Sequence, residues 1–251
     1  MKYTGERIIL EAEECRPNTL MYREHAERYK FASKYVSGKR VLDIACGVGY
    51  GCQILLQDGS PASIIGGDIS PDAVEYAETH FAKKDKVRFS VMNAEQIDLP
   101  PASVDVVVSF ETIEHLSGVD KYISGIVRAL DRGGMFIVST PNRDLTQDGV
   151  HTVDNPFHHH EFTLDEIQEL LGRNFNVTEV FYQREYQPNT MTSAVNKISR
   201  FRSIYRKVVP RIIREDLRNY FWPDISLDVG VYPFKPSVRP LNYILVCKKR
   251  V

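Results

Sequence analysis

The sequence has little cysteine and no long apolar run. Its 251 residues include four cysteines, which form no Cys-x-x-Cys pair and no regular framework. A disulfide scaffold is therefore excluded, and a reducing compartment is indicated. No stretch approaches the roughly 18 apolar residues of a membrane span, and no leading charged-then-apolar segment resembles a signal peptide. These absences predict a cytoplasmic protein.

The chain also lacks an excess of charge of either sign. Thirty-two Lys and Arg residues oppose 33 Asp and Glu residues, which gives a formal net charge of -1. No global field therefore favours nucleic acid or an anionic membrane, and no nucleic-acid partner is expected. The length is ordinary for a single α/β domain with a large buried core.

The glycines that are present include three closely spaced ones within residues 40–51, RVLDIACGVGYG. The apolar start predicts a buried parallel strand, and Gly47, Gly49 and Gly51 predict the tight turn that opens a helix. The last glycine of the dinucleotide fingerprint is absent because position 52 is Cys, so NAD and FAD are disfavoured. Asp43 would repel a pyrophosphate but attract an ammonium and a sulfonium. The pattern points to S-adenosylmethionine.

A second carboxylate supports this interpretation. Residues 63–68 predict another strand, and it ends at Asp68, where a ribose diol could be bound through two hydrogen bonds. Ser70 and Pro71 then predict the N-cap and first position of a new helix. The alternative is that Asp68 is an ordinary turn residue at the end of a strand.

Five segments together resemble the successive motifs of class I S-adenosylmethionine-dependent methyltransferases. They are VLDIACGVGYG, GGDISPDAVEYAE, MNAEQIDLP, SVDVVVSFETIEHL and ALDRGGMFIVSTPN, which span residues 40–142 in the family's order. TGERIIL, HAERYKFA and NPFHHHEFTLDEIQELL are further similar to bacterial methyltransferases of sugar and glycan pathways, with motifs like those of the type 11 and ubiquinone-biosynthesis enzymes. Asn93 stands where the family often has Asp, and its carbonyl can accept the same adenine contact.

The order of predicted elements indicates one α/β domain. Helices are expected at 17–36, 49–57, 71–81, 120–130 and after the capping box at 163–166, and strands at 40–45, 63–68, 87–92, 104–110, 135–139, 176–182 and 242–248. This alternation favours a mostly parallel, Rossmann-like sheet with helices on both faces. The resemblance implies seven strands, the last antiparallel. The division is an N-terminal helical segment at 1–38, a core at 40–185, an acceptor-cap insertion at 186–240 and a final strand at 241–251, with an irregular tail at 222–240.

Open α/β sheets bind ligands beyond the carboxyl ends of their strands, so four segments should converge on one crevice. Gly47 and Gly49 would let the cofactor approach the backbone, Asp68 would bind the ribose, and Phe110 would cover the methionine. Plain core packing is the alternative for Ile69 and Phe110. Amphipathic packing is the alternative for the first helix. The expected cofactor-binding residues are Asp43, Ala45, Gly47, Gly49, Asp68, Ile69, Asn93, Ala94, Glu95, Phe110, Tyr22 and Arg28.

Methyl transfer to a hydroxyl needs a proton acceptor, for which neutral histidine is a common choice. His115 follows the fourth strand and is the first candidate base, and His160, beside Glu161, is the second. A junction role for His115 and a solvated loop for the histidine triplet at 158–160 are the alternatives. No metal is expected, although ligand types also gather at Asp144, Asp148, His151, Asp154 and the triplet.

Residues 197–214, KISRFRSIYRKVVPRIIR, concentrate basic side chains in a nearly neutral chain. The apolar spacing predicts an amphipathic helix with a basic face. This face could meet an anionic acceptor such as a nucleotide-linked sugar, rest on a membrane surface, or be solvated.

The expected function is O-methylation of a sugar, glycan or other small-molecule acceptor, with S-adenosylmethionine as cofactor and S-adenosylhomocysteine as product. N-methylation of an amino sugar and methylation of a quinone-type lipid precursor are the alternatives. Two other classes stay open, a nicotinamide oxidoreductase and a non-catalytic cofactor-binding or scaffold protein.

Overall fold

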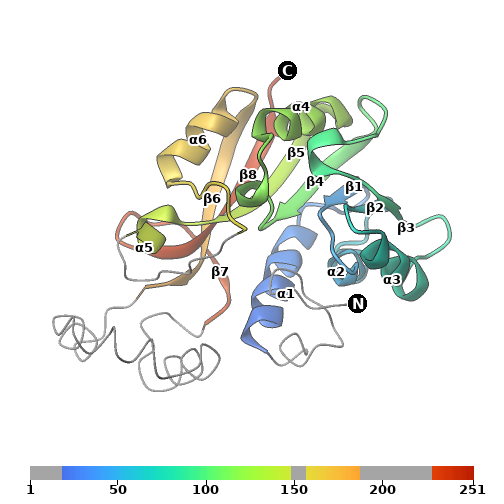
Figure 1. Cartoon of the computed structure of the whole chain (residues 1–251), viewed down its shortest axis with the longest axis horizontal. Coiled ribbons are helices and arrows are strands. Elements are labelled where there is room, and N and C mark those ends of the chain that lie inside the picture. Colours follow the sequence, from blue (N-terminus) through green and yellow to red (C-terminus); the bar gives the residue numbers. More distant parts are fainter. Residues whose placement is uncertain (1–18, 148–156, 187–227) are drawn as a thin grey trace.

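A computed structural model describes residues 19–147, 157–186 and 228–251, and one eight-stranded sheet runs through them (Figure 1). The strand order is β3-β2-β1-β4-β5-β8-β6-β7. The strands are β1 Arg40–Ile44, β2 Ser63–Asp68, β3 Val87–Val91, β4 Val104–Phe110, β5 Leu130–Pro141, β6 Phe175–Glu185, β7 Val231–Pro233 and β8 Pro240–Lys249. The predicted Rossmann-like α/β class is confirmed.

The parallel part of the sheet determines where the ligand crevice lies. β1 pairs in parallel with β2 on one side and with β4 on the other, so the strand order reverses between β1 and β4. Such a reversal leaves room for a ligand beyond the carboxyl ends of the strands. β8 lies antiparallel between β5 and β6, as the resemblance implies for the last strand.

The sheet has one strand more than the seven expected. Residues Val231–Pro233 form β7, which pairs antiparallel with β6 at the sheet edge. The prediction of an irregular tail across residues 222–240 is therefore wrong for this stretch. The backbone hydrogen bonds of an open edge accept a short strand even where proline and aromatic residues suggest a loop.

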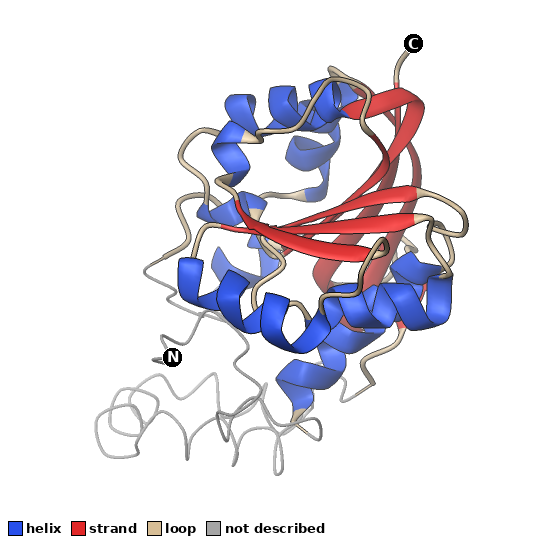
Figure 2. Cartoon of the chain, turned by 90° about the vertical axis from the view of Figure 1, so that its right-hand side faces the viewer, coloured by secondary structure: helices blue, strands red, loops and turns tan. Residues whose placement is uncertain are grey.

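Helices cover both faces of the sheet (Figure 2). The longer helices are α1 Leu20–Ser33, α2 Tyr50–Gly59, α3 Pro71–Phe81, α4 Val119–Ala129 and α6 Leu164–Gly172, and shorter ones are η2 Ala94–Gln96, η3 Ile113–His115 and α5 Arg143–Gln147. Side chains of α1, α2 and α3 form one apolar core, and those of α4 and α6 form another. The two cores sandwich the sheet between them.

The helix starts follow their capping residues. Ser70 accepts a hydrogen bond from the Ala73 N–H with Pro71 at the first helical position, and Thr163 and Glu166 form the predicted reciprocal capping box. In the part of the chain that the structure describes, no helix is long and apolar enough to cross a bilayer.

Several predicted features lie outside the described residues. They are the TGERIIL segment, Cys15, the possible ligands Asp148, His151 and Asp154, the basic segment at 197–214, and most of the expected acceptor cap.

Candidate active site

The glycine loop joins β1 to α2 and has an unusual backbone. Ala45, Gly47 and Gly49 all have positive φ, at 62°, 58° and 85°. For Ala45 this conformation is uncommon and costs energy, which is typical of functional sites. A Cβ at position 49 would lie 2.7 Å from Ala77 Cβ and 2.8 Å from the Phe89 ring, so only glycine fits there. The loop is thus held in one tight shape at the crevice.

Asp68 ends β2 beside this loop and is buried. One carboxylate oxygen accepts a hydrogen bond from Gly47 N at 2.9 Å, and the other accepts one from Ser70 N at 2.9 Å. The side chain therefore holds the glycine loop against the start of α3. Asp68 also lies at the carboxyl end of β2, which is where the predicted ribose contact requires it.

Asp43 lies beneath the loop, with no solvent exposure. Its carboxylate accepts hydrogen bonds from Tyr29 Oη at 3.2 Å and from Cys52 Sγ at 3.2 Å. Burial raises its pKa from 3.8 to about 7, against the smaller lowering by these two hydrogen bonds. The sequence argument assumed a charged carboxylate facing the cofactor, whereas the structure places this group in the core, supporting the loop from below.

The expected adenine side is built from the ends of β2 and β3. Ile69 is 63% exposed, so it is an uncovered apolar surface and not core, as adenine packing requires. Ala94 is buried, and Asn93 Oδ1 accepts the Glu95 N–H at 2.9 Å as the N-cap of η2. Glu95 instead accepts hydrogen bonds from Gly118 N at 2.8 Å and Ser117 Oγ at 3.2 Å, which lower its pKa. Its carboxylate thereby caps the start of α4.

Helix α1 closes one side of this region through aromatic contacts. The Tyr29 ring lies 5.1 Å from the Phe110 ring and 5.8 Å from Tyr50, edge to face in both pairs. The Tyr22 ring lies 5.5 Å from Tyr50. Phe110 is buried in this cluster, so packing against α1 is one of its roles.

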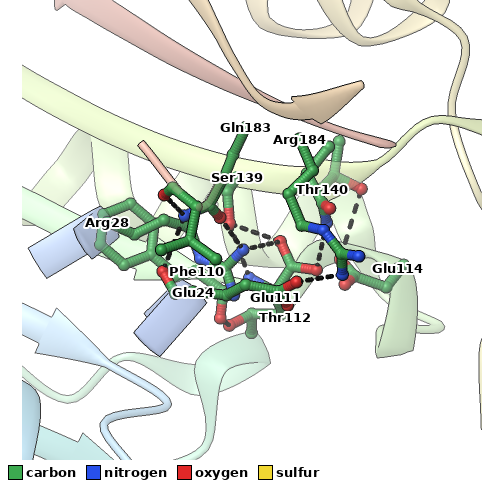
Figure 3. Close-up of polar contacts among 12 residues, drawn as sticks. Glu24, Arg28, Phe110, Glu111, Thr112, Glu114, Ser139, Thr140, Gln183 and Arg184 are labelled. Atoms are coloured by element: carbon green, nitrogen blue, oxygen red, sulfur yellow. Dashed lines mark hydrogen bonds and ion pairs between the residues drawn. The ribbon is translucent and has the colours of Figure 1, made fainter. Parts of the chain in front are cut away.

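Arg28, one of the predicted cofactor-binding residues, is bound by other side chains of the protein. It is 2% exposed, donates to Gln183 Oε1 at 2.6 Å and lies 3.9 Å from Glu111 Oε1 (Figure 3). Gln183 in turn donates to the Glu24 carbonyl at 2.9 Å, so the pair ties α1 to β6. The structure therefore shows Arg28 linking α1 to β6 through Gln183. A direct contact between Arg28 and the cofactor stays a prediction.

Two acidic residues follow β4 in the same region, the partly buried Glu111 and the fully buried Glu114 (Figure 3). Glu111 has a positive φ of 49° and accepts hydrogen bonds from Ser139 Oγ at 2.6 Å and Asn242 Nδ2 at 2.7 Å. Glu114 is fully buried, and Thr140 Oγ1 donates to its Oε2 at 3.4 Å. Burial, and then the neighbouring Glu111, raise the pKa of Glu114 well above its usual range. The left-handed backbone at Glu111 and the buried carboxylate of Glu114 make this turn a candidate part of the functional site.

The two predicted bases are not brought together. His115 meets His158, with ring centroids 4.7 Å apart, whereas the His160 ring packs on Phe162 at 4.6 Å. The His115 Nδ1 lies 3.2 Å from the Phe157 carbonyl oxygen. The His158 Nδ1 lies 2.7 Å from a carboxylate oxygen of Glu161. His158, not His160, therefore shares the crevice edge with His115.

Sequence reasoning missed Glu111, Glu114, the His158–Glu161 pair and Asn242. The ETIEH run after β4 was a usable signal, because two glutamates three apart turn toward one side of a helical turn. Asn242 had no such signal, since it reaches Glu111 from a strand 131 residues later.

Comparison with known proteins places these features in context. A family model described as "Methyltransferase domain" matches residues 36–194. A protein of Mycolicibacterium smegmatis described as "Probable S-adenosylmethionine-dependent methyltransferase" is 36% identical over 67% of this chain and 62% of its own length. A ubiquinone biosynthesis O-methyltransferase of Sinorhizobium medicae is 33% identical over 49% of each chain. The solved YcgJ protein of Bacillus subtilis superposes with a TM-score of 0.60 at 21% identity, covering 92% of this chain and 99% of that one.

The chain thus matches less than two thirds of the length of these curated relatives. The region that the family model matches contains the glycine loop, Asp68 and the ETIEH turn.

Proposed function

The chain belongs to the S-adenosylmethionine-dependent methyltransferases, and from that premise we propose that it transfers the cofactor's methyl group to a hydroxyl oxygen of a small-molecule acceptor. A sugar or glycan hydroxyl is the leading acceptor class. We further propose that Asp68, Ile69, Asn93 and the glycine loop hold the cofactor.

The observation that carries the proposal is the histidine pair beyond β4. A carbonyl oxygen only accepts hydrogen bonds, so the 3.2 Å contact with Phe157 makes Nδ1 of His115 the donor, and in the neutral ring Nε2 is then the proton acceptor. Glu161 assigns the same tautomer to His158. Two imidazoles with Nε2 lone pairs suit an acceptor that must give up a proton.

The methyl transfer itself requires no general acid or base at the sulfur. Methyl transfer is an in-line displacement in which the positive charge of the sulfonium is lost, so positioning in a water-poor pocket supplies much of the rate. The apolar cluster of Tyr29, Tyr50 and Phe110 lies next to the loop and supports such an environment. The remaining chemical requirement is removal of the hydroxyl proton.

A phenolic hydroxyl of a quinone-type precursor is the second candidate acceptor. It is favoured by the 33% identity to a ubiquinone biosynthesis O-methyltransferase over half of the chain. That match covers half of that relative, so the acceptor does not follow from it. N-methylation of an amino sugar is the remaining candidate.

The test is a turnover assay with an acceptor panel. Purified protein and S-adenosylmethionine would be incubated with nucleotide-linked sugars, a dihydroxybenzoate and amino sugars, and S-adenosylhomocysteine would be measured by mass spectrometry. We expect turnover with a hydroxyl acceptor and a product heavier by one methylene on oxygen. Turnover confined to the amines would contradict the proposal. Because Cys46, Cys52 and Cys247 are free thiols, the assay buffer should contain a reducing agent.

A further inference from the structure

We propose that Glu114, His115 and His158 form a binding site for a divalent transition-metal cation such as Zn²⁺. One ligand atom from each of the three side chains lies within 4.8 Å of the other two. The inference goes beyond the proposed function, because cation binding is measured with neither cofactor nor acceptor present.

The first support is an unsatisfied carboxylate oxygen. Glu114 has no solvent exposure, and its Oε1 accepts no hydrogen bond from the residues that the structure describes. This oxygen lies 4.0 Å from His115 Nε2 and thus points toward the histidine pair. A buried carboxylate oxygen without a partner is costly, and a cation between it and the imidazoles would satisfy it.

The second support is the orientation of both histidines. Metal-binding histidines usually donate their other ring N–H to a carbonyl or a carboxylate, which fixes the ring and its tautomer. His115 has the Phe157 carbonyl as this partner, and His158 has Glu161. In each ring Nδ1 is therefore held by the protein, and Nε2 is the atom that would bind the cation.

The third support is the connection between the two segments that carry the ligands. Glu114 and His115 belong to η3 after β4, and His158 belongs to the segment before α6. The backbone N–H groups of His159 and His160 both donate to the Glu114 carbonyl, at 2.8 and 3.2 Å. These bonds keep His158 beside η3, so the ligands are assembled before a cation arrives.

The ligand set indicates the kind of cation. Two imidazoles and one carboxylate suit Zn²⁺, Fe²⁺, Co²⁺ or Ni²⁺ better than Mg²⁺ or Ca²⁺, which prefer oxygen ligands. Three ligands from the described residues leave a coordination position open, as in catalytic zinc sites. A hydroxyl acceptor could occupy it. Asp144, which the sequence also offered as a ligand, is not part of this set, and Asp148, His151 and Asp154 lie outside the described residues.

The experiment uses the untagged 251-residue chain freed of metal by a chelator. Isothermal titration with ZnCl₂ should show one site per chain, confirmed by elemental analysis after desalting, and binding should raise the melting temperature. His158→Ala and Glu114→Gln should each weaken binding at least about tenfold, and Glu161→Gln by about 10–100-fold through lost orientation of His158. Affinity should fall in acid, because Glu114 and both histidines must be unprotonated to bind.

The matched control is His159→Ala, which removes an exposed imidazole adjacent to His158. This variant should keep the affinity of the unaltered protein. Absence of Zn²⁺ binding, or equal weakening by His159→Ala and His158→Ala, would overturn the inference. The titration measures no methyl transfer, so the metal site and the methyltransferase activity can fail separately. A bound cation would occupy Nε2 of His115, so the base role proposed for His115 applies to the metal-free site.

Discussion

At the scale of single residues, two aspartates at the ends of neighbouring strands have different environments. Asp43 is enclosed by Tyr29 and Cys52, and Asp68 joins the glycine loop to the start of α3. Of the two, Asp68 is the one that ends its strand beside the glycine loop. We therefore assign the cofactor contact to Asp68 and a supporting role to Asp43.

Asp68→Ala should weaken S-adenosylhomocysteine binding by more than about tenfold. Losing a charge-assisted pair of hydrogen bonds costs roughly 1.5–3 kcal/mol, or about one to two decades in affinity. Titration calorimetry measures the effect, with circular dichroism to verify folding. Asp72→Ala, which removes an exposed carboxylate on α3, is the control. An unchanged dissociation constant for Asp68→Ala would remove this residue from the cofactor site.

His115→Ala should lower kcat by about 10²–10⁴-fold, which is the usual effect of removing a general base. Cofactor affinity should change little. His160→Ala should cause the smaller loss, because its ring packs on Phe162 and not on the His115–His158 pair. The assay uses whichever hydroxyl acceptor the panel identifies. Equal activity of His115→Ala on that acceptor would refute the role, and a small effect is expected if the acceptor is an amine.

At the scale of secondary-structure elements, the contact between α1 and α2 shapes the site. Gly51 lies in the first turn of α2, and the Tyr29 ring of α1 packs directly over it. Tyr29 also reaches Asp43 through its hydroxyl and Phe110 through its ring. The missing side chain at position 51 thus lets α1 sit close enough to close the crevice.

Gly51→Ala should destabilise the protein by about 1–3 kcal/mol, the usual cost of an added methyl in a packed core. The new Cβ would lie 2.1 Å from Tyr29 Cζ, which forces α1 away from α2. Gly172→Ala is the matched control, since a Cβ there meets nothing within 4 Å in helix α6. Urea denaturation compares the two variants. Equal stability of both would show that α1 is not held by this contact.

At the scale of the whole molecule, buried acids make stability depend on pH. Asp43 keeps its proton in the folded state up to about pH 7, whereas the unfolded chain loses it near 3.8. Between these values the unfolded state binds fewer protons, so the contribution of Asp43 to stability falls as pH rises, and it is constant above the folded pKa. At neutral pH, the ionisation of buried Asp43 therefore lowers the free energy of unfolding.

Asp43→Asn should remove this effect of ionisation. In the absence of cofactor, its free energy of unfolding relative to the unaltered protein should rise by roughly 2–3 kcal/mol between pH 5 and pH 8. Guanidinium denaturation at both pH values measures the difference. Asp72→Asn controls for loss of a carboxylate at an exposed position. A difference that is flat or falls with pH would contradict the buried, proton-binding Asp43.

Much of the fold followed from local sequence signals. The glycine loop, the capping residues at Ser70 and Thr163, and the alternation of apolar strands with helices predicted the parallel core and its crevice. These signals are local because backbone conformation and strand burial depend on nearby residues. The motif order within residues 40–142 likewise pointed to the cofactor class that the comparisons support.

The tertiary structure alone decided which side chains meet. Arg28 reaches Gln183 across 155 residues, and His115 meets His158 in place of His160. It also decided that Asp43 lies beneath the loop and that Val231–Pro233 adds a strand. Such outcomes depend on how separate elements pack and which partners satisfy buried polar groups. Sequence spacing carries no record of this packing, because distant residues become neighbours only when the sheet and its helices assemble.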